Sequence, residues 1–103
     1  MLDYTITRTD NPTSTKELSE ILANPGFGKH FTDHMVTIDW TEEKGWHNAQ
    51  VRPYGPMTME PASNVFHYGQ AIFEGIKAYR QPDDSIATFR PDHNAQRLSL
   101  IHI

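Results

Sequence analysis

The chain has 103 residues, of which 37% are hydrophobic and 21% are charged, a composition typical of a globular domain and not of a disordered chain. The formal net charge of −4 argues against a nucleic-acid partner bound by a basic face, and the absence of cysteine excludes disulfides. The sequence has no signal-peptide pattern and no apolar run long enough to cross a bilayer. We therefore expect a cytoplasmic protein with no membrane partner.

Residues 1–14 are polar and predict an extended lead. The segment "STKELSEILANPG" predicts a helix that Ser14 or Thr15 can cap. Its apolar side chains recur at helical spacing, at Leu18, Ile21 and Leu22. The helix is expected to end at Asn24-Pro25-Gly26, because proline pushes the preceding residue out of the α region and glycine permits a left-handed turn.

Alternating apolar residues in "HMVTIDW", a "TEEKG" turn and a second strand-like run predict an antiparallel hairpin over residues 34–54. "AIFEGIKAYR" and "IATFR", joined by "QPDDS", predict a second hairpin. A last helix is expected to begin near Pro91. The pattern is that of an α+β protein, with an antiparallel sheet and flanking helices.

The strand predicted over residues 71–80 carries an unexpected acid. Alternation places Glu74 on the same face as apolar Ile72 and Ile76, with Lys77 on the opposite face. Because an unpaired buried carboxylate is costly, Glu74 is expected to meet a backbone or basic partner from elsewhere, which the sequence does not name.

Three groups of side chains have both a chemical and a purely structural interpretation. In "HFTDH", His30 and His34 lie close to Asp33, and on a helix the two histidines would share a face and could bind a metal. The segment leads into β-type residues and offers no obvious third ligand, so polar loop residues and no metal site are favoured. Lys77 could form a Schiff base or be a solvent-facing strand lysine. Arg97 could hold a phosphate or be a solvated charge on a helix, and spacing does not decide between the two.

Four segments in order, "FGKHFTDHMVTIDW", "GWHNAQVRPYGP", "HYGQAIFEGIKAYR" and "FRPDHNAQR", resemble the branched-chain amino acid aminotransferases. These are pyridoxal-phosphate-dependent enzymes of fold type IV. The "FTDHM" segment resembles this group more than the related D-amino-acid aminotransferases and aminodeoxychorismate lyases, which are the alternative. The resemblance implies the incomplete N-terminal small domain of such an enzyme.

The resemblance also implies roles for matched residues. Arg97 would bind the phosphate of pyridoxal phosphate. Phe27, Tyr68 and Phe73 would line the pocket for the branched side chain, with Tyr68 able to reach a neighbouring subunit's site. The implied reaction transfers an amino group between leucine, isoleucine or valine and 2-oxoglutarate, in an enzyme that is a homodimer.

The chain departs from the family in two respects. The family's Schiff-base lysine lies well downstream, and no lysine here stands at a matching position; the lysines are Lys16, Lys29, Lys44 and Lys77. The resemblance also fades after Arg97. We therefore expect three parts: a lead and helix (1–25), a partial small domain (26–97) and an atypical tail that is a truncation or foreign sequence (98–103).

Such a fragment would be inactive alone and would fold poorly by itself, because its core is thin and its last helix is apolar and unfinished. A different class of function remains open at this point, namely a non-catalytic α+β module for binding or dimerisation.

Overall fold

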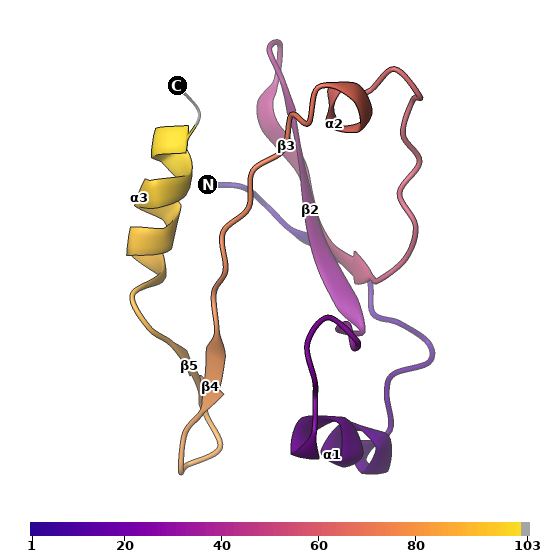
Figure 1. Ribbon diagram of the computed structural model, residues 1–103, viewed down its shortest axis with the longest axis vertical. Coiled ribbons are helices and arrows are strands. Elements are labelled where there is room, and N and C mark those ends of the chain that lie inside the picture. The colour runs from indigo at the N-terminus through magenta and orange to yellow at the C-terminus, as the bar shows by residue number, and fades with distance from the viewer. Residues whose placement is uncertain (102–103) are drawn as a thin grey trace. The chain divides into compact units, whose positions relative to one another are not determined.

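The computed structural model describes residues 1–101 of the chain, which form two compact units (Figure 1). The first unit runs from Met1 to Met57 and the second begins at Thr58. The last two residues of the predicted tail, 102–103, lie outside the described part. The predicted boundaries at residues 25 and 97 remain predictions.

A three-stranded sheet forms the centre of the first unit. It consists of β1 (Thr5–Ile6), β3 (Gly45–Pro53) and β2 (His34–Thr41), in that order across the sheet. The β2 and β3 strands pair antiparallel, which confirms the hairpin predicted over residues 34–54. The predicted antiparallel sheet is confirmed only in part, because β1 adds to β3 in parallel and makes this sheet mixed. Polar Thr5 and Arg8 around β1 concealed this short strand in the sequence.

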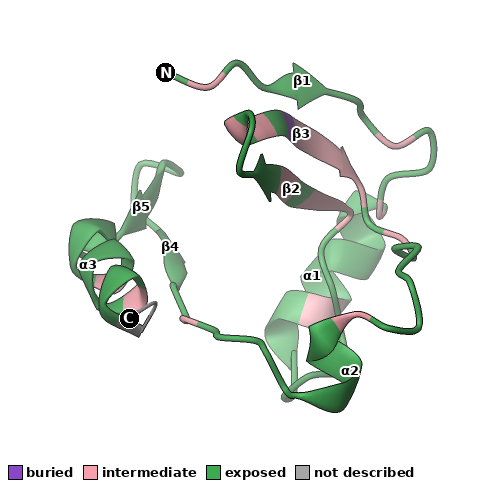
Figure 2. Cartoon of the chain, turned by 90° about the horizontal axis from the view of Figure 1, so that it is seen from above, coloured by how far each residue is buried: buried purple, intermediate pink, exposed green. Residues whose placement is uncertain are grey.

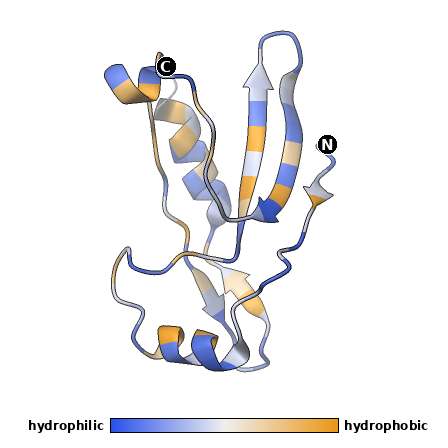
Figure 3. Ribbon diagram, turned by 90° about the vertical axis from the view of Figure 1, so that its right-hand side faces the viewer, coloured by the Kyte–Doolittle hydropathy of each residue, from blue (hydrophilic) through white to orange (hydrophobic). Residues whose placement is uncertain are grey.

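The hairpin contains a bulge that changes its register. Thr37 pairs with Gln50 and Asp39 with His47, so β3 carries one residue more than β2 between these pairs. Asn48 occupies the left-handed region at φ 52°, which asparagine tolerates better than most residues. Its side-chain amide donates to Asp39 Oδ2 at 2.8 Å. The bulge thus shifts the pairing of the two strands, along which hydrophilic and hydrophobic residues are interspersed (Figure 3).

Helix α1 (Thr15–Ala23) confirms the first predicted helix and its cap. Ser14 is the N-cap, and its Oγ accepts a hydrogen bond from the backbone N–H of Glu17 at 3.2 Å. The helix ends at its C-cap residue Asn24, which directly precedes Pro25. The N–H of Asn24 donates to the carbonyl of Ile21. Local capping and termination signals therefore set both ends of this helix.

The second unit consists of short elements: α2 (Asn64–His67), β4 (Ala78–Arg80), β5 (Ile86–Thr88) and α3 (Pro91–Ile101). The β4–β5 hairpin and its turn are confirmed, with the N–H of Asp84 donating to the carbonyl of Gln81 at 2.9 Å. Helix α3 begins at Pro91, as predicted. The α2 helix was not predicted.

The strand predicted over residues 71–80 is confirmed only over residues 78–80, because residues 71–77 are not β-structure. Ala78 already pairs with Thr88 at the end of β5. Continuing the ladder upstream would need a partner beyond residue 88, but Arg90 turns at φ 45° and Pro91 starts α3 without a backbone N–H. The face assignments made for Ile72, Glu74 and Ile76 by strand alternation therefore do not apply.

Burial is slight throughout. Among residues 1–100, Ala49 in β3 alone is buried, at 3% exposed, and most other residues are exposed (Figure 2). The half-buried residues gather along β2 and β3. The core of this chain is accordingly thin, as its length led us to expect.

Candidate functional site

The second unit contains a polar cluster that joins helix α3 to the irregular segment of residues 71–77. Asn94 and Arg97 lie three residues apart on α3, a spacing that places both side chains on one side of the helix. Arg97 Nη1 donates to Glu74 Oε2 at 2.5 Å, and Asn94 Nδ2 donates to Glu74 Oε1 at 2.9 Å. The expected basic partner of Glu74 is thereby confirmed, and it is Arg97.

The same two side chains also bind backbone carbonyls next to Glu74. Asn94 Nδ2 lies 2.9 Å from the carbonyl oxygen of Gly75, and Arg97 Nη1 lies 3.4 Å from that of Phe73. Residues 73–75, which make no strand pairing, are therefore attached to α3 by side-chain donors. The segment around Glu74 is thus held in place by side-chain hydrogen bonds from α3 and not by strand pairing.

The electrostatics of the cluster favour an ionised Glu74. The hydrogen bond from Arg97 lowers the pKa of Glu74 below its ordinary value, and the hydrogen bond from Asn94 lowers it further. Glu74 is 18% exposed and Arg97 is 61% exposed, so the arginine remains open to solvent while bound to the acid. Among the described residues, only Nη1 of the guanidinium is engaged, which leaves Nε and Nη2 for an anion.

An open hollow of about 550 Å³ adjoins this cluster. Its walls come from the 72–76 segment and α3, and they are mainly apolar; the lining residues are Ile72, Phe73, Glu74, Ile76, Pro91, Asn94, Ala95 and Leu98. Phe73 is the one predicted substrate residue that lines it. The structure therefore brings Phe73 and Arg97 together at one place.

The other two predicted substrate residues are not part of this cluster. Tyr68 follows α2 as its C-cap residue, and its ring is exposed. Phe27 belongs to the first unit, where it is exposed between Gly26 and Gly28, both at positive φ (66° and 68°). All three aromatic rings are available to contact a ligand or another part of a protein.

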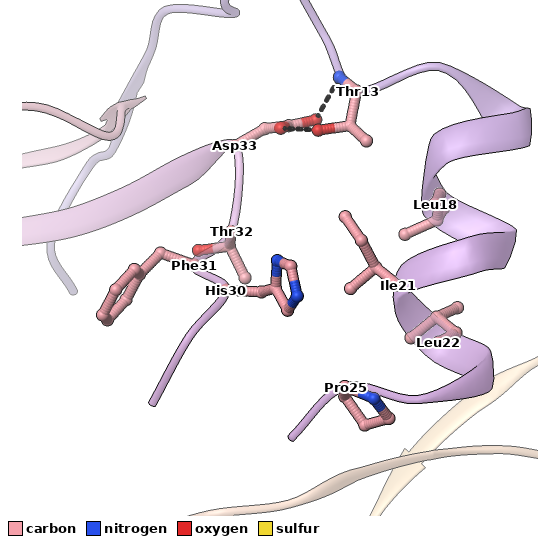
Figure 4. Close-up of a pocket in the computed structure, with 9 residues that line it drawn as sticks. All are labelled: Thr13, Leu18, Ile21, Leu22, Pro25, His30, Phe31, Thr32 and Asp33. Atoms are coloured by element: carbon pink, nitrogen blue, oxygen red, sulfur yellow. Dashed lines mark hydrogen bonds between the residues drawn. The ribbon is translucent and has the colours of Figure 1, made fainter. Parts of the chain in front are cut away.

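A second hollow, of about 350 Å³, lies in the first unit between α1 and the segment that precedes β2 (Figure 4). Leu18, Ile21 and Leu22 of α1 face the ring of His30 across it. At its edge Asp33 accepts two hydrogen bonds from Thr13, from the hydroxyl at 2.5 Å and from the backbone N–H at 3.0 Å. These bonds lower the pKa of Asp33, the hydroxyl contributing most.

Two of the three side chains considered around the metal hypothesis, His34 and Asp33, make other contacts. His34 Nε2 accepts the backbone N–H of Thr9 at 3.0 Å, and Asp33 is bound to Thr13. Within residues 1–101, no three His, Cys, Asp or Glu side chains converge as metal ligands do. These contacts attach Thr9 and Thr13 to the start of β2.

Lys77 lies over an aromatic ring. Its Nζ is 5.1 Å from the centroid of the Tyr79 ring, and the residue is exposed. Among the helices described, none has the length and apolar character needed to cross a membrane.

Comparison with curated proteins finds relatives that match most of this chain. A probable branched-chain-amino-acid aminotransferase of Streptomyces coelicolor is 62% identical over 87 residues, which cover 84% of this chain and 24% of the relative. The chain is homologous to branched-chain-amino-acid aminotransferases. The branched-chain-amino-acid aminotransferase of Mycolicibacterium smegmatis is 58% identical over 97 residues, covering 94% of this chain and 26% of the relative.

A third aminotransferase, branched-chain-amino-acid transaminase 1 of Bacillus subtilis, is 54% identical over 74 residues, or 72% of this chain and 21% of the relative. The chain thus spans about a quarter of the length of the aminotransferases that it matches. No protein-family model matches the chain. The resemblance recognised in the sequence is confirmed, and the match is to a part of each aminotransferase.

Sequence reasoning missed Asn94, which holds Glu74 together with Arg97. Its position three residues before Arg97 on a predicted helix was the available signal, since that spacing puts both donors on one side. Sequence reasoning also missed the two hydrogen bonds from Thr13 to Asp33. No local pattern indicates that contact, because the two residues are 20 positions apart.

Proposed function

We propose that this chain works as part of a pyridoxal-phosphate-dependent transaminase of fold type IV, which transfers an amino group between leucine, isoleucine or valine and 2-oxoglutarate. The observation that carries the proposal is the 62% identity to a protein named as a probable branched-chain-amino-acid aminotransferase. Relatives from three bacterial genera with the same kind of name support it further. In this proposal the complete enzyme is a homodimer.

Arg97 is the residue we propose for the phosphate of the cofactor. Its guanidinium is exposed, its Nε and Nη2 are not bonded within the described residues, and two parallel donors suit a phosphate. The donor set therefore fits the group. Pyridoxal phosphate, when bound, supplies an electron sink for the reaction at the amino acid.

Phe27, Tyr68 and Phe73 are proposed to contact the substrate side chain. Their exposed rings offer apolar surface, which selects branched aliphatic side chains by removing methyl groups from water. Selection by such contacts is modest, about 10- to 200-fold for each methylene group, so several rings acting together are expected. These residues bind and orient, and the proton-transferring lysine is assigned to the part of the relatives that this chain does not match.

A chimera tests the proposal directly. This chain replaces the matching segment of the Mycolicibacterium smegmatis relative, to which it is 58% identical. We expect the purified chimera to transfer the amino group of leucine to 2-oxoglutarate, as measured by glutamate formation, and the chain alone to give no turnover. Turnover of D-alanine with no turnover of leucine would favour the alternative substrate class. A chimera that folds and binds pyridoxal phosphate but uses neither substrate would contradict the proposal.

A further inference from the structure

The carboxylate of Glu74 accepts three hydrogen bonds from protein donors. It accepts from Arg97, from Asn94 and from the N–H of Gly75, at 2.5, 2.9 and 3.3 Å. Two of the three donors are side chains of α3, and the third belongs to its own segment. The result is a carboxylate held on both oxygens and, at 18% exposed, mostly withdrawn from solvent.

Such a fixed carboxylate in turn fixes the guanidinium of Arg97. An arginine side chain has several rotatable bonds, and a guanidinium without a partner loses that freedom when it binds an anion. Glu74 Oε2 and the carbonyl of Phe73 both contact Nη1, so they restrain the plane of the guanidinium from one corner. The Nε and Nη2 donors, unbonded within the described residues, are then left as a pair for an anion.

We propose that Glu74 is a positioning residue that orients Arg97 to receive the phosphate of the cofactor, with Asn94 holding the second oxygen of Glu74 in place. The inference rests on the proposed function, because it assigns Glu74 a role at the phosphate site. It also explains why an acid stands in an apolar segment: the acid serves Arg97 and not the packing of a strand.

The opposite role is physically possible and gives the opposite result. A carboxylate beside an arginine could compete with phosphate for the guanidinium, in which case removing Glu74 would tighten cofactor binding. Its contact with Nη1 alone favours positioning, since Nε and Nη2, a pair that suits a phosphate, are unbonded within the described residues. The sign of the change in affinity separates the two roles.

The test uses the chimera with Glu74→Ala, Glu74→Gln and the control Glu60→Ala, which removes an exposed acid of the same unit. Dissociation constants are measured for pyridoxal phosphate and for pyridoxal, which lacks the phosphate. We expect Glu74→Ala to weaken pyridoxal phosphate about tenfold, the effect of losing one charge-assisted hydrogen bond. Glu74→Gln keeps an acceptor for Nη1 and should recover most of that loss, while Glu60→Ala should bind like the parent.

The affinity for pyridoxal should change less than about twofold in every variant, because pyridoxal has no phosphate for Arg97 to bind. A positioning role therefore predicts that the tenfold effect is confined to pyridoxal phosphate. Unchanged or tighter binding of pyridoxal phosphate by Glu74→Ala overturns the inference and leaves the proposed function standing. Equal weakening of both ligands overturns it as well, because the role is then structural. A parent chimera that binds no pyridoxal phosphate overturns both the inference and the cofactor assignment.

Discussion

In the unit Met1–Met57, β2 and β3 are eight and nine residues long, whereas β4 and β5 of the unit beginning at Thr58 have three residues each. The first unit is therefore ordered mainly by a backbone ladder. In the second, side-chain donors of α3 hold residues 73–75 where no ladder exists. The candidate phosphate-binding residue thus lies in the unit whose order depends on a few polar contacts.

The two units should differ in how well they tolerate side-chain substitutions. A backbone ladder tolerates surface substitutions, because its hydrogen bonds do not involve the side chains. A side-chain network is sensitive to single substitutions, because each member has few replacements. Substitution at the buried position should therefore destabilise the first unit most. In the second unit, substitutions in the polar cluster should have the largest effect on stability.

The largest expected effect concerns both units together. With Ala49 the single buried residue among positions 1–100, the isolated chain should lack a cooperative unfolding transition. Differential scanning calorimetry of the chain and of the chimera tests this, with a sharp transition expected for the chimera alone. A sharp transition of the isolated chain would contradict the prediction that it folds poorly, and would give the binding-module alternative new weight.

A smaller effect should follow from a charge at the buried position of β3. Ala49→Asp in the chimera places an unpaired carboxylate at a site only 3% exposed, and should lower the free energy of unfolding by about 3 kcal/mol. Urea denaturation measures it. Ala71→Asp, the same substitution at an exposed alanine of the second unit, is the matched control and should shift the midpoint little. Equal shifts at both positions would mean that burial in the sheet does not distinguish the units.

The smallest effect concerns Asp33, whose pKa lies below the ordinary 3.8 chiefly because the Thr13 hydroxyl donates to it. A carboxyl whose pKa is lowered by folding stabilises the fold above its unfolded pKa, and this stabilisation disappears as the pH falls through the folded pKa. Thr13→Ala in the chimera should therefore lower the urea midpoint slightly at pH 7 and not below the folded pKa.

The control for that titration is Thr7→Ala, which removes an exposed hydroxyl from the same lead segment. It should leave the midpoint unchanged at every pH. A Thr13→Ala effect that persists below the folded pKa of Asp33 would show that the hydroxyl acts through packing and not through the carboxylate.

Much of the secondary structure could be predicted because its signals are local. Ser14 caps α1, and Pro91 opens α3, by interactions within a few residues. The strand predicted upstream of Ala78 was wrong for a non-local reason. Residues 71–77 have the apolar content of a strand, but β5 ends at Thr88 and offers them no partner.

The candidate site was predictable only in part. The resemblance carried by "FRPDHNAQR" and "HYGQAIFEGIKAYR" selected Arg97, Phe73, Tyr68 and Phe27 without any structure, and their assignment to cofactor and substrate remains a prediction. What the sequence determined by itself was the α+β class, the two hairpins, the helix caps and the kinship with aminotransferases, all of which follow from neighbouring residues or from matched segments. Tertiary structure alone decided that β1 joins β3 and that Glu74 pairs with Arg97 and Asn94. Those contacts join residues 20 or more positions apart, and no periodicity along a chain specifies which distant groups will meet.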